Sequence, residues 1–263
     1  MTQIDAVLTA GGGNKPSDPL YPFTQGKPKA LLPIAGKPMV QWVLDALAAC
    51  DQINRVVVIG LQPEHGLTAG SKVLDYLPDT GNLVDNMRTG LERVLQLNPQ
   101  ANYALGVSAD IPGLRAEHVN WLIDTCLQTD HDAYYALIER QVMEARYPTS
   151  RRTYTHLKGK VVCGGDMNLF ATRLVRNDPA LWQRITAARK NVFKQASLIG
   201  LEMLFLLAVR QLTIERATQQ FSQRLSIRGR VVLCPYAEVG MDVDKPSQYA
   251  MMEKDLASHL APL

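Results

Sequence analysis

The sequence predicts an α/β fold with a mainly parallel, open sheet and helices on both faces. Short β-branched runs alternate with segments of helical periodicity over the first 140 residues, and this alternation is typical of a parallel sheet. The run RVVVIG, residues 55–60, is continuously apolar, as expected for a strand buried on both faces. The 263 residues suffice for one large domain, and 46% of them are hydrophobic.

The elements expected in this first part alternate in order. Apolar runs bounded by turn residues predict strands over 4–8, 55–60, 72–76, 103–107 and 133–138. Apolar residues recurring at helical spacing predict helices after Pro38, over 83–97 and over 117–127. The proline-rich loop between the first strand and the first helix is long, and long loops in compact domains are usually functional.

The pattern changes after residue 140. Residues 140–160 are polar and basic and indicate an insertion over one end of the sheet, and residues 161–170 contain a Gly-Gly turn. Residues 179–221 are expected to be mostly helical, followed by a strand over 230–233 and a helix from about Pro246. We therefore expect a single domain over 1–263 with a helical sub-region at 140–228.

Composition excludes several classes of protein. The net charge of +3 gives no case for nucleic-acid binding. The scattered cysteines form no C-x-x-C pair, which disfavours a zinc site or a disulfide framework; they are Cys50, Cys126, Cys163 and Cys234. The first residues lack the basic and apolar regions of a signal peptide. We expect a cytoplasmic protein, and the sequence leaves a homodimer open.

The apolar run ASLIGLEMLFLLAV, residues 196–209, tests this expectation. It is shorter than the roughly 20 residues of a membrane-spanning helix, and it contains Glu202. The sequence favours a buried or interface helix. An amphipathic helix lying on a membrane surface is the alternative.

A glycine run marks the candidate ligand site. The segment LTAGGGNK, residues 8–15, places three glycines directly after the first strand, where backbone N–H groups can form an anion-binding turn. Lys15 and Lys29 could neutralise phosphate oxygens. A P-loop is excluded because Gly36-Lys37 is followed by Pro38, and the spacing G-x-G-x-x-G of a dinucleotide fold is absent. A simple tight turn is the alternative.

Two separated blocks, AGGGNK and KPKALLPIAGKPM, resemble the opening of the nucleotidyltransferases with a glycosyltransferase-A-like fold, and most of all the MobA-like NTP transferases. The resemblance covers nearly the whole chain, with poor definition over 140–228. It implies that the turn at Ala10, Gly11, Gly12 and Gly13 holds the base and phosphates of a nucleotide. It also implies that Lys29 contacts phosphate at the reacting centre. Lys15 stands near the position where the family usually has an arginine.

The resemblance implies further nucleotide contacts on the helix at 83–97. The segment DNMRTGL, residues 85–91, matches a family pattern near the base and ribose, which assigns nucleotide binding to Asn86 and Gly90. Asn86 replaces the more usual serine. Asn86 or Asp85 could instead cap this helix.

The resemblance also implies a magnesium site made of two distant aspartates. Asp110 follows the strand at 103–107, at the sheet edge where open α/β folds bind ligands. Asp244, in the segment GMDVDKPS, resembles the second family ligand, whereas Asp242 alternates to the other side of an extended chain. Magnesium prefers oxygen ligands and shares itself with substrate phosphates. Both aspartates could instead be turn and cap residues.

The acceptor side is less defined. The segment GGDMN, residues 164–168, resembles the family's acceptor-binding segment and assigns Gly165 and Asn168 to the acceptor. The expected reaction moves a nucleoside monophosphate from an NTP to a small phosphorylated acceptor. Two alternatives are a nucleotide-binding regulatory protein without turnover and a peripheral membrane enzyme acting on a lipid-linked phosphate.

Overall fold

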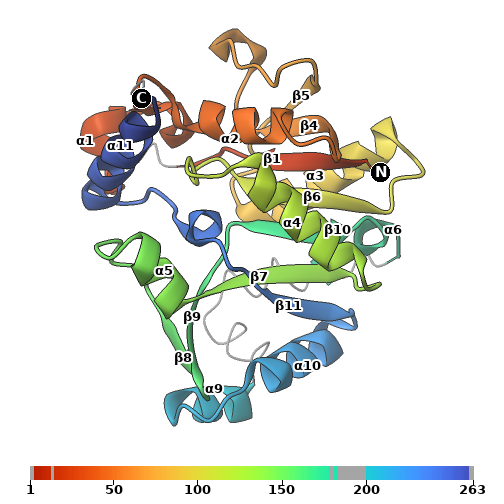
Figure 1. The fold of residues 1–263 in the computed structure, drawn as a ribbon. Helices are drawn as coiled ribbons and strands as arrows, with labels where there is room; N and C mark the ends of the chain where they lie inside the picture. The colour runs from red at the N-terminus through yellow and green to blue at the C-terminus, as the bar shows by residue number, and fades with distance from the viewer. Residues whose placement is uncertain (1–2, 13–14, 178–180, 183–199, 261–263) are drawn as a thin grey trace.

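The computed structural model describes residues 3–12, 15–177, 181–182 and 200–260, and a nine-stranded sheet forms its centre (Figure 1). Eight strands lie in the order β5-β4-β1-β6-β10-β7-β9-β8, and β11 pairs with β7. Their bounds are β1 Ile4–Thr9, β4 Ile53–Ile59, β5 Val73–Leu77, β6 Tyr103–Ser108, β7 Ala133–Glu139, β8 Thr155–Leu157, β9 Lys160–Gly164, β10 Met167–Ala171 and β11 Gly229–Leu233. A separate two-stranded ladder joins β2 (Pro33–Ile34) to β3 (Lys37–Pro38).

The sheet is parallel where the sequence alternates strand and helix. Strand β1 pairs in parallel with β4 and β6, and β4 pairs in parallel with β5. Every residue of β1 is buried, as expected for a central strand covered on both faces. The carboxyl ends of these four strands therefore meet at one edge of the sheet. The expected α/β class is confirmed.

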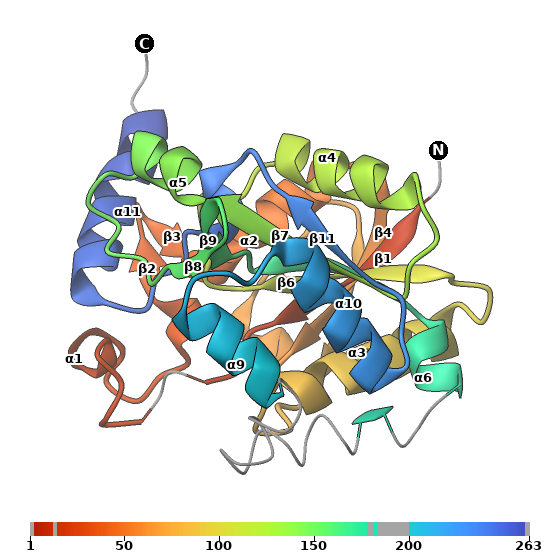
Figure 2. The same ribbon diagram turned by 90° about the horizontal axis from the view of Figure 1, so that it is seen from below.

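Helices cover both faces of the sheet (Figure 2). The larger core lies under α2 (Met39–Ala48), α4 (Ala116–Leu127), α5 (Arg140–Arg146) and α11 (Pro246–Leu260). The smaller core lies under α3 (Leu83–Leu97), α6 (Arg173–Asn177) and α10 (Ile214–Leu225). Other helical segments in the described part of the chain include α1 (Tyr21–Thr24), α9 (Leu201–Ala208) and the 3₁₀ turns η1 (Lys29–Leu31), η2 (Pro63–His65) and η3 (Ala237–Gly240).

The described part of the sub-region at 140–228 contains strands as well as helices. It contributes β8, β9 and β10 to the sheet, all through antiparallel ladders. Strand β10 lies between β6 and β7, and its residues alternate between buried and partly exposed. That short period-2 pattern, MNLFA, is the signal of a strand. Residues 178–180 and 183–199, within the expected helical stretch, lie outside the described residues.

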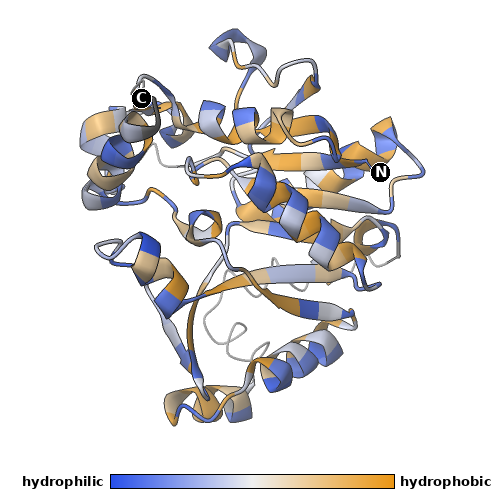
Figure 3. Ribbon diagram, in the orientation of Figure 1, coloured by the Kyte–Doolittle hydropathy of each residue, from blue (hydrophilic) through white to orange (hydrophobic). Residues whose placement is uncertain are grey.

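The apolar run at 196–209 is described only from Gly200 onward, and Gly200 is the N-cap of α9. Apolar residues colour much of α9 and of the central strands in Figure 3, whereas α10 is largely polar. In α9, Met203 is buried and Phe205 is 66% exposed. No helix within the described part of the chain is both long and apolar enough to cross a membrane.

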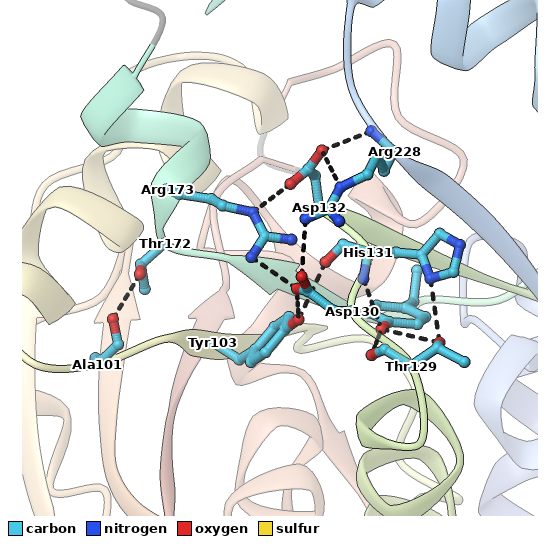
Figure 4. Close-up of polar contacts among 10 residues, drawn as sticks. Ala101, Tyr103, Thr129, Asp130, His131, Asp132, Thr172, Arg173 and Arg228 are labelled. Carbon is cyan, nitrogen blue, oxygen red and sulfur yellow. Dashed lines mark hydrogen bonds and ion pairs between the residues drawn. The ribbon is translucent and has the colours of Figure 1, made fainter.

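An ion-pair network ties segments together at the amino end of β7 (Figure 4). Asp130 accepts hydrogen bonds from Tyr103 at 2.9 Å and from Arg228 at 3.0 Å, and it pairs with Arg173 at 2.8 Å. Asp132 pairs with the Arg173 guanidinium and accepts a hydrogen bond from the backbone N–H of Arg228 at 2.5 Å. The network joins the starts of β7 and β11 to α6, at the edge of the sheet opposite the carboxyl end of β1.

Candidate active site at the carboxyl ends of the strands

Two distant aspartates converge on one lysine. The Lys29 Nζ lies 2.7 Å from Asp110 Oδ2 and 2.5 Å from Asp244 Oδ1. Lys29 begins η1 in the loop after β1, Asp110 follows β6, and Asp244 precedes α11. Strands β1 and β6 are neighbours in the parallel part of the sheet, so the segments that follow them share one edge.

Neighbouring residues hold the Asp110 carboxylate and the backbone of Asp244. The Ser108 hydroxyl donates to Asp110 Oδ1 at 2.6 Å, and the Val243 N–H donates to the Asp110 carbonyl at 2.9 Å. The second bond links the two aspartate segments directly. On the other side, the Asp244 N–H donates to Oε1 of the buried Gln248 at 3.0 Å. Gln248 is part of the first turn of α11, and its side chain also positions Asp244.

The Lys29 ammonium is held charged by its partners. Burial disfavours the ammonium, but the adjacent Asp110 and Asp244 carboxylates outweigh burial and raise the pKa of Lys29 above its ordinary value. The Lys29 and Asp110 side chains are only 14% and 18% exposed, whereas Asp244 is 52% exposed. The cluster therefore opens to solvent on the Asp244 side.

A third carboxylate, Asp166, lies beside this cluster and was missed from the sequence. Its backbone N–H donates to the Val239 carbonyl at 2.8 Å, and its carbonyl accepts from the Ser108 N–H at 2.9 Å. Its Oδ2 is buried and has no hydrogen-bond partner among the described residues. Burial raises the pKa of Asp166 to about 7, and the charges of Asp110 and Asp244 add to the rise.

Arg152 is the cation nearest to Asp166. Its Nη2 lies 3.8 Å from Asp166 Oδ2, and its Nη1 pairs with Asp242. This pairing agrees with the expectation that Asp242 does not share the orientation of Asp244. The Arg152 and Asp242 side chains are each 14% exposed, so the pair is largely withdrawn from solvent.

The glycine turn lies at the same edge. The Ala10 N–H donates to the Ile59 carbonyl at 2.8 Å, and Gly12 has a φ of 95° that favours glycine. A Cβ on Gly60 would lie 2.7 Å from the backbone nitrogen of Gly11, so the end of β4 supports the turn closely. Gly13 lies outside the described residues, and Lys15 is exposed. Their ligand contacts stay predictions.

The structure gives Asn86 and Gly90 supporting positions on α3. The cap of α3 is Asn82, whose side chain accepts from the Asp85 N–H, so neither Asp85 nor Asn86 caps the helix. Asn86 is buried; its amide donates to Asp79 Oδ1 at 2.8 Å, and its carbonyl oxygen accepts from the Thr80 N–H at 2.8 Å.

Gly90 allows α3 to approach the sheet. A Cβ there would lie 2.3 Å from Val7 Cγ1 and 3.1 Å from Ile59 Cδ1. The close packing of α3 on the sheet therefore accounts for a glycine at this position, and no ligand contact is needed to explain it. A nucleotide contact by Gly90 stays a prediction, and this buried position gives it no support.

The two acceptor-side residues also have structural partners. Asn168 lies on β10, accepts from the Ala136 N–H at 2.9 Å and donates to the Gly165 carbonyl at 3.2 Å. A Cβ on Gly165 would lie 3.0 Å from the Ala136 Cβ. The expected turn between strands therefore joins β9 and β10 tightly to β7. Acceptor binding by Gly165 and Asn168 stays a prediction.

The donor set suits a hard divalent cation. Carboxylate oxygens from Asp110 and Asp244 face the same point, where a positive charge from Lys29 already lies. Magnesium commonly uses one or two protein carboxylates and completes its shell with water and phosphate. Within the described residues, no group of three or more histidine, cysteine, aspartate or glutamate side chains is arranged to hold a metal. Two carboxylates fit magnesium shared with a substrate.

Comparisons with known proteins agree with this geometry. The model of the MobA-like NTP transferase domain matches residues 6–211. A structure described as a hypothetical transferase from Thermus thermophilus is 32% identical, with a TM-score of 0.80 over 94% of this chain and 100% of that one. A CMP:2-keto-3-deoxy-manno-octonic acid synthetase complexed with CTP shares the fold at 15% identity, with a TM-score of 0.58 over 98% and 100% of the two chains.

Curated relatives match over shorter stretches. The bifunctional protein GlmU of Exiguobacterium sibiricum is 29% identical over 132 residues, which are 49% of this chain and 27% of that protein. The GlmU of Methanococcus maripaludis is 31% identical over 78 residues, which are 29% of this chain and 16% of that protein. The chain thus spans only a minor part of these two relatives.

The fold, the glycine turn and the paired carboxylates define a nucleotidyltransferase-type protein. The family model covers more than half of the chain, so the chain belongs to the MobA-like NTP transferase family.

Proposed function

We propose that the protein transfers a nucleoside monophosphate from an NTP to a small phosphorylated acceptor and releases pyrophosphate. The convergence of Lys29, Asp110 and Asp244 beside the glycine turn is the observation that carries this proposal. It brings one ammonium group and two carboxylates to the edge of the sheet, where the backbone turn can hold phosphates.

The chemistry needs no protein nucleophile. An oxygen of the acceptor phosphate, already an anion, attacks the α-phosphorus of the NTP, and the bond from that phosphorus to the bridging oxygen of pyrophosphate breaks. The electron pair of the broken bond stays on pyrophosphate. Lys29 is held charged by its two partners, so it can stabilise negative charge that spreads over the phosphate oxygens. Positioning supplies much of the remaining catalysis.

A bound cation fits the same pair of aspartates. Asp110 and Asp244 would hold magnesium, which supplies positive charge to the triphosphate when bound. In this structure the Lys29 ammonium bridges the two carboxylates. We therefore infer that Lys29 leaves this bridge and contacts phosphate when substrates are present.

Pyrophosphate release tests the proposal. Wild-type protein is mixed with each of the four NTPs, magnesium and a panel of sugar 1-phosphates and polyol phosphates. We expect release with at least one pair, loss after chelation, and loss of at least 100-fold in Asp110→Asn. Asp51→Asn changes an exposed aspartate near the amino end of β4 and serves as the control. NTP binding without release for any acceptor would favour the regulatory alternative.

Lipid-linked acceptors remain the other alternative. Flotation of the protein with anionic vesicles at low salt tests it, because surface binding depends on charge and on exposed apolar residues such as Phe205. The proposal of a small acceptor predicts that the protein stays with the unbound fraction.

A further inference from the structure

The turn between β2 and β3 is strained, and a side chain from α11 holds it. Its two central residues, Ala35 and Gly36, have φ values of 47° and 85°. Positive φ at both positions is typical of a type I′ turn, where asparagine and glycine are preferred. An alanine there carries a steric cost that glycine avoids. The Ala35 N–H donates to Glu253 Oε2 at 2.8 Å, so a carboxylate stabilises the strained residue.

The turn is continuous with the segment that carries Lys29. Lys29 begins η1, and the Leu32 N–H donates to the Lys29 carbonyl at 3.0 Å. Strand β2 follows directly at Pro33, whose carbonyl accepts from the Tyr249 hydroxyl of α11 at 2.9 Å. Because this short segment is bonded at both ends, a displacement of the turn is transmitted to Lys29.

Helix α11 connects this turn to the other side of the candidate site. The helix begins two residues after Asp244, and Gln248 in its first turn accepts from the Asp244 N–H at 3.0 Å. Glu253 lies further along the same helix, which runs beside the β2–β3 ladder in Figure 2. Helix backbones are stiff because hydrogen bonds close every turn. One helix therefore holds the backbone of Asp244 at one end and the lysine loop further along.

We propose that Glu253 is a positioning residue for Lys29, which it sets at a fixed place relative to Asp244 by tying the strained turn to α11. The proposal rests on the proposed nucleotidyl transfer, in which Lys29 contacts phosphate. Glu253 acts through the backbone that carries the ammonium group, and not on the substrate. Stabilising the turn alone would be a merely structural role, because it would leave the distance between Lys29 and Asp244 unset.

Steady-state pyrophosphate release separates positioning from substrate binding. Glu253→Ala is expected to lower kcat about 10-fold and to change the KM for the NTP by less than about 2-fold, because the ammonium acts on charge that develops as the phosphate bond breaks. Glu253→Gln keeps an acceptor oxygen at the same place, so it should retain roughly half of the wild-type kcat or more. A higher KM with an unchanged kcat would overturn the inference.

Two further variants support this comparison. Glu64→Ala, at an exposed glutamate of η2, is the control and should match wild type. Glu253→Asp draws the carboxylate back by one methylene with less disturbance of the fold, and it should lower kcat in the same direction as Glu253→Ala. A wild-type kcat in Glu253→Asp and Glu253→Ala would contradict a positioning role.

A substitution in the turn distinguishes positioning from local stabilisation. Ala35→Asn introduces a residue type that a type I′ turn prefers, so it favours the turn without help from Glu253. Combined with Glu253→Ala, it should leave kcat low, because the link to α11 is still missing. Recovery of kcat in the double variant would overturn the inference, since the conformation of the turn alone would then suffice.

Binding of Mn²⁺ without nucleotide gives a readout that does not depend on turnover. Lys29 bridges the two carboxylates assigned to the cation, so a less firmly held Lys29 competes less with the metal. Calorimetry should show about 3- to 10-fold tighter Mn²⁺ binding in Glu253→Ala, and no change from the same substitution in a Lys29→Met background. No tightening, or equal tightening in both backgrounds, would show that the effect does not pass through Lys29.

The failures of the two proposals are distinguishable. If no acceptor supports pyrophosphate release, nucleotidyl transfer fails and the Mn²⁺ measurement still decides the role of Glu253. If release occurs and Glu253→Ala matches wild type in kcat and in Mn²⁺ affinity, the positioning role fails and nucleotidyl transfer stands.

Discussion

Replacing Lys29 by methionine should tighten the binding of a divalent cation while removing activity. In the structure the Lys29 ammonium lies 2.7 Å and 2.5 Å from the two carboxylates that we assign to magnesium. An incoming cation must displace that ammonium. A hydrogen bond between charged groups contributes about 1.5–3 kcal/mol net. Allowing one such bond, because Asp244 is half exposed, we expect Lys29→Met to bind Mg²⁺ or Mn²⁺ about 10- to 100-fold more tightly.

Titration calorimetry with Mn²⁺ in the absence of nucleotide measures this effect. The same variant should release pyrophosphate at least 100-fold more slowly than wild type, because a charge aimed at the phosphates is lost. Lys37→Met is the control, since Lys37 pairs with Asp45. Unchanged or weaker Mn²⁺ binding in Lys29→Met would refute the competition between lysine and metal.

Three further predictions concern stability. Folding raises the pKa of Asp166 to about 7, so ionisation of Asp166 destabilises the fold as pH rises from about 4 to 7. In urea unfolding with EDTA, Asp166→Asn should raise the free energy of unfolding by about 2 kcal/mol near pH 8 and leave it unchanged near pH 4. Asp132→Ala should cost about 2–4 kcal/mol in urea unfolding, because its side chain is 13% exposed, whereas Asp130→Ala, 64% exposed, should cost clearly less; equal costs would contradict the network in Figure 4. Gly60→Ala should cost about 2–5 kcal/mol because its φ is 95° and its Cβ would meet the backbone, whereas Gly159→Ala, with a φ of 75° and open space, should cost about 1 kcal/mol.

The sequence was sufficient to predict the parallel part of the fold and the place of Asp110 at its carboxyl edge. Buried strands alternating with helices predict a common carboxyl edge, and Asp110 directly follows one such strand. The resemblance added Lys29 and Asp244, which lie far apart in the chain. The structure brings all three together, so the predicted convergence is confirmed as geometry. Binding of magnesium stays a prediction.

The antiparallel part of the sheet could not be predicted from the sequence in the same way. Asp166 lies in the segment GGDMN, but its place beside Asp110 depends on β10 entering between β6 and β7. No local pattern specifies a pairing partner for a five-residue strand. Arg152 lies in a basic segment that looks like a solvated surface, yet it pairs with Asp242 in the interior of the site.

Asn86 and Gly90 show a second limit. The resemblance places both residues near the nucleotide. A sequence motif does not show whether a residue contacts the ligand or only holds another part of the protein in place. In the structure the Asn86 amide donates a hydrogen bond to Asp79, and the absence of a side chain at Gly90 lets α3 pack closely against Val7.

Anomalous diffraction from crystals soaked with Mn²⁺ and an NTP tests the central assignment most directly. We predict a manganese peak bonded to carboxylate oxygens of both Asp110 and Asp244, with triphosphate oxygens in the same shell and Lys29 on phosphate. A peak bound elsewhere, or a triphosphate seated away from the Ala10–Gly12 turn, would contradict it.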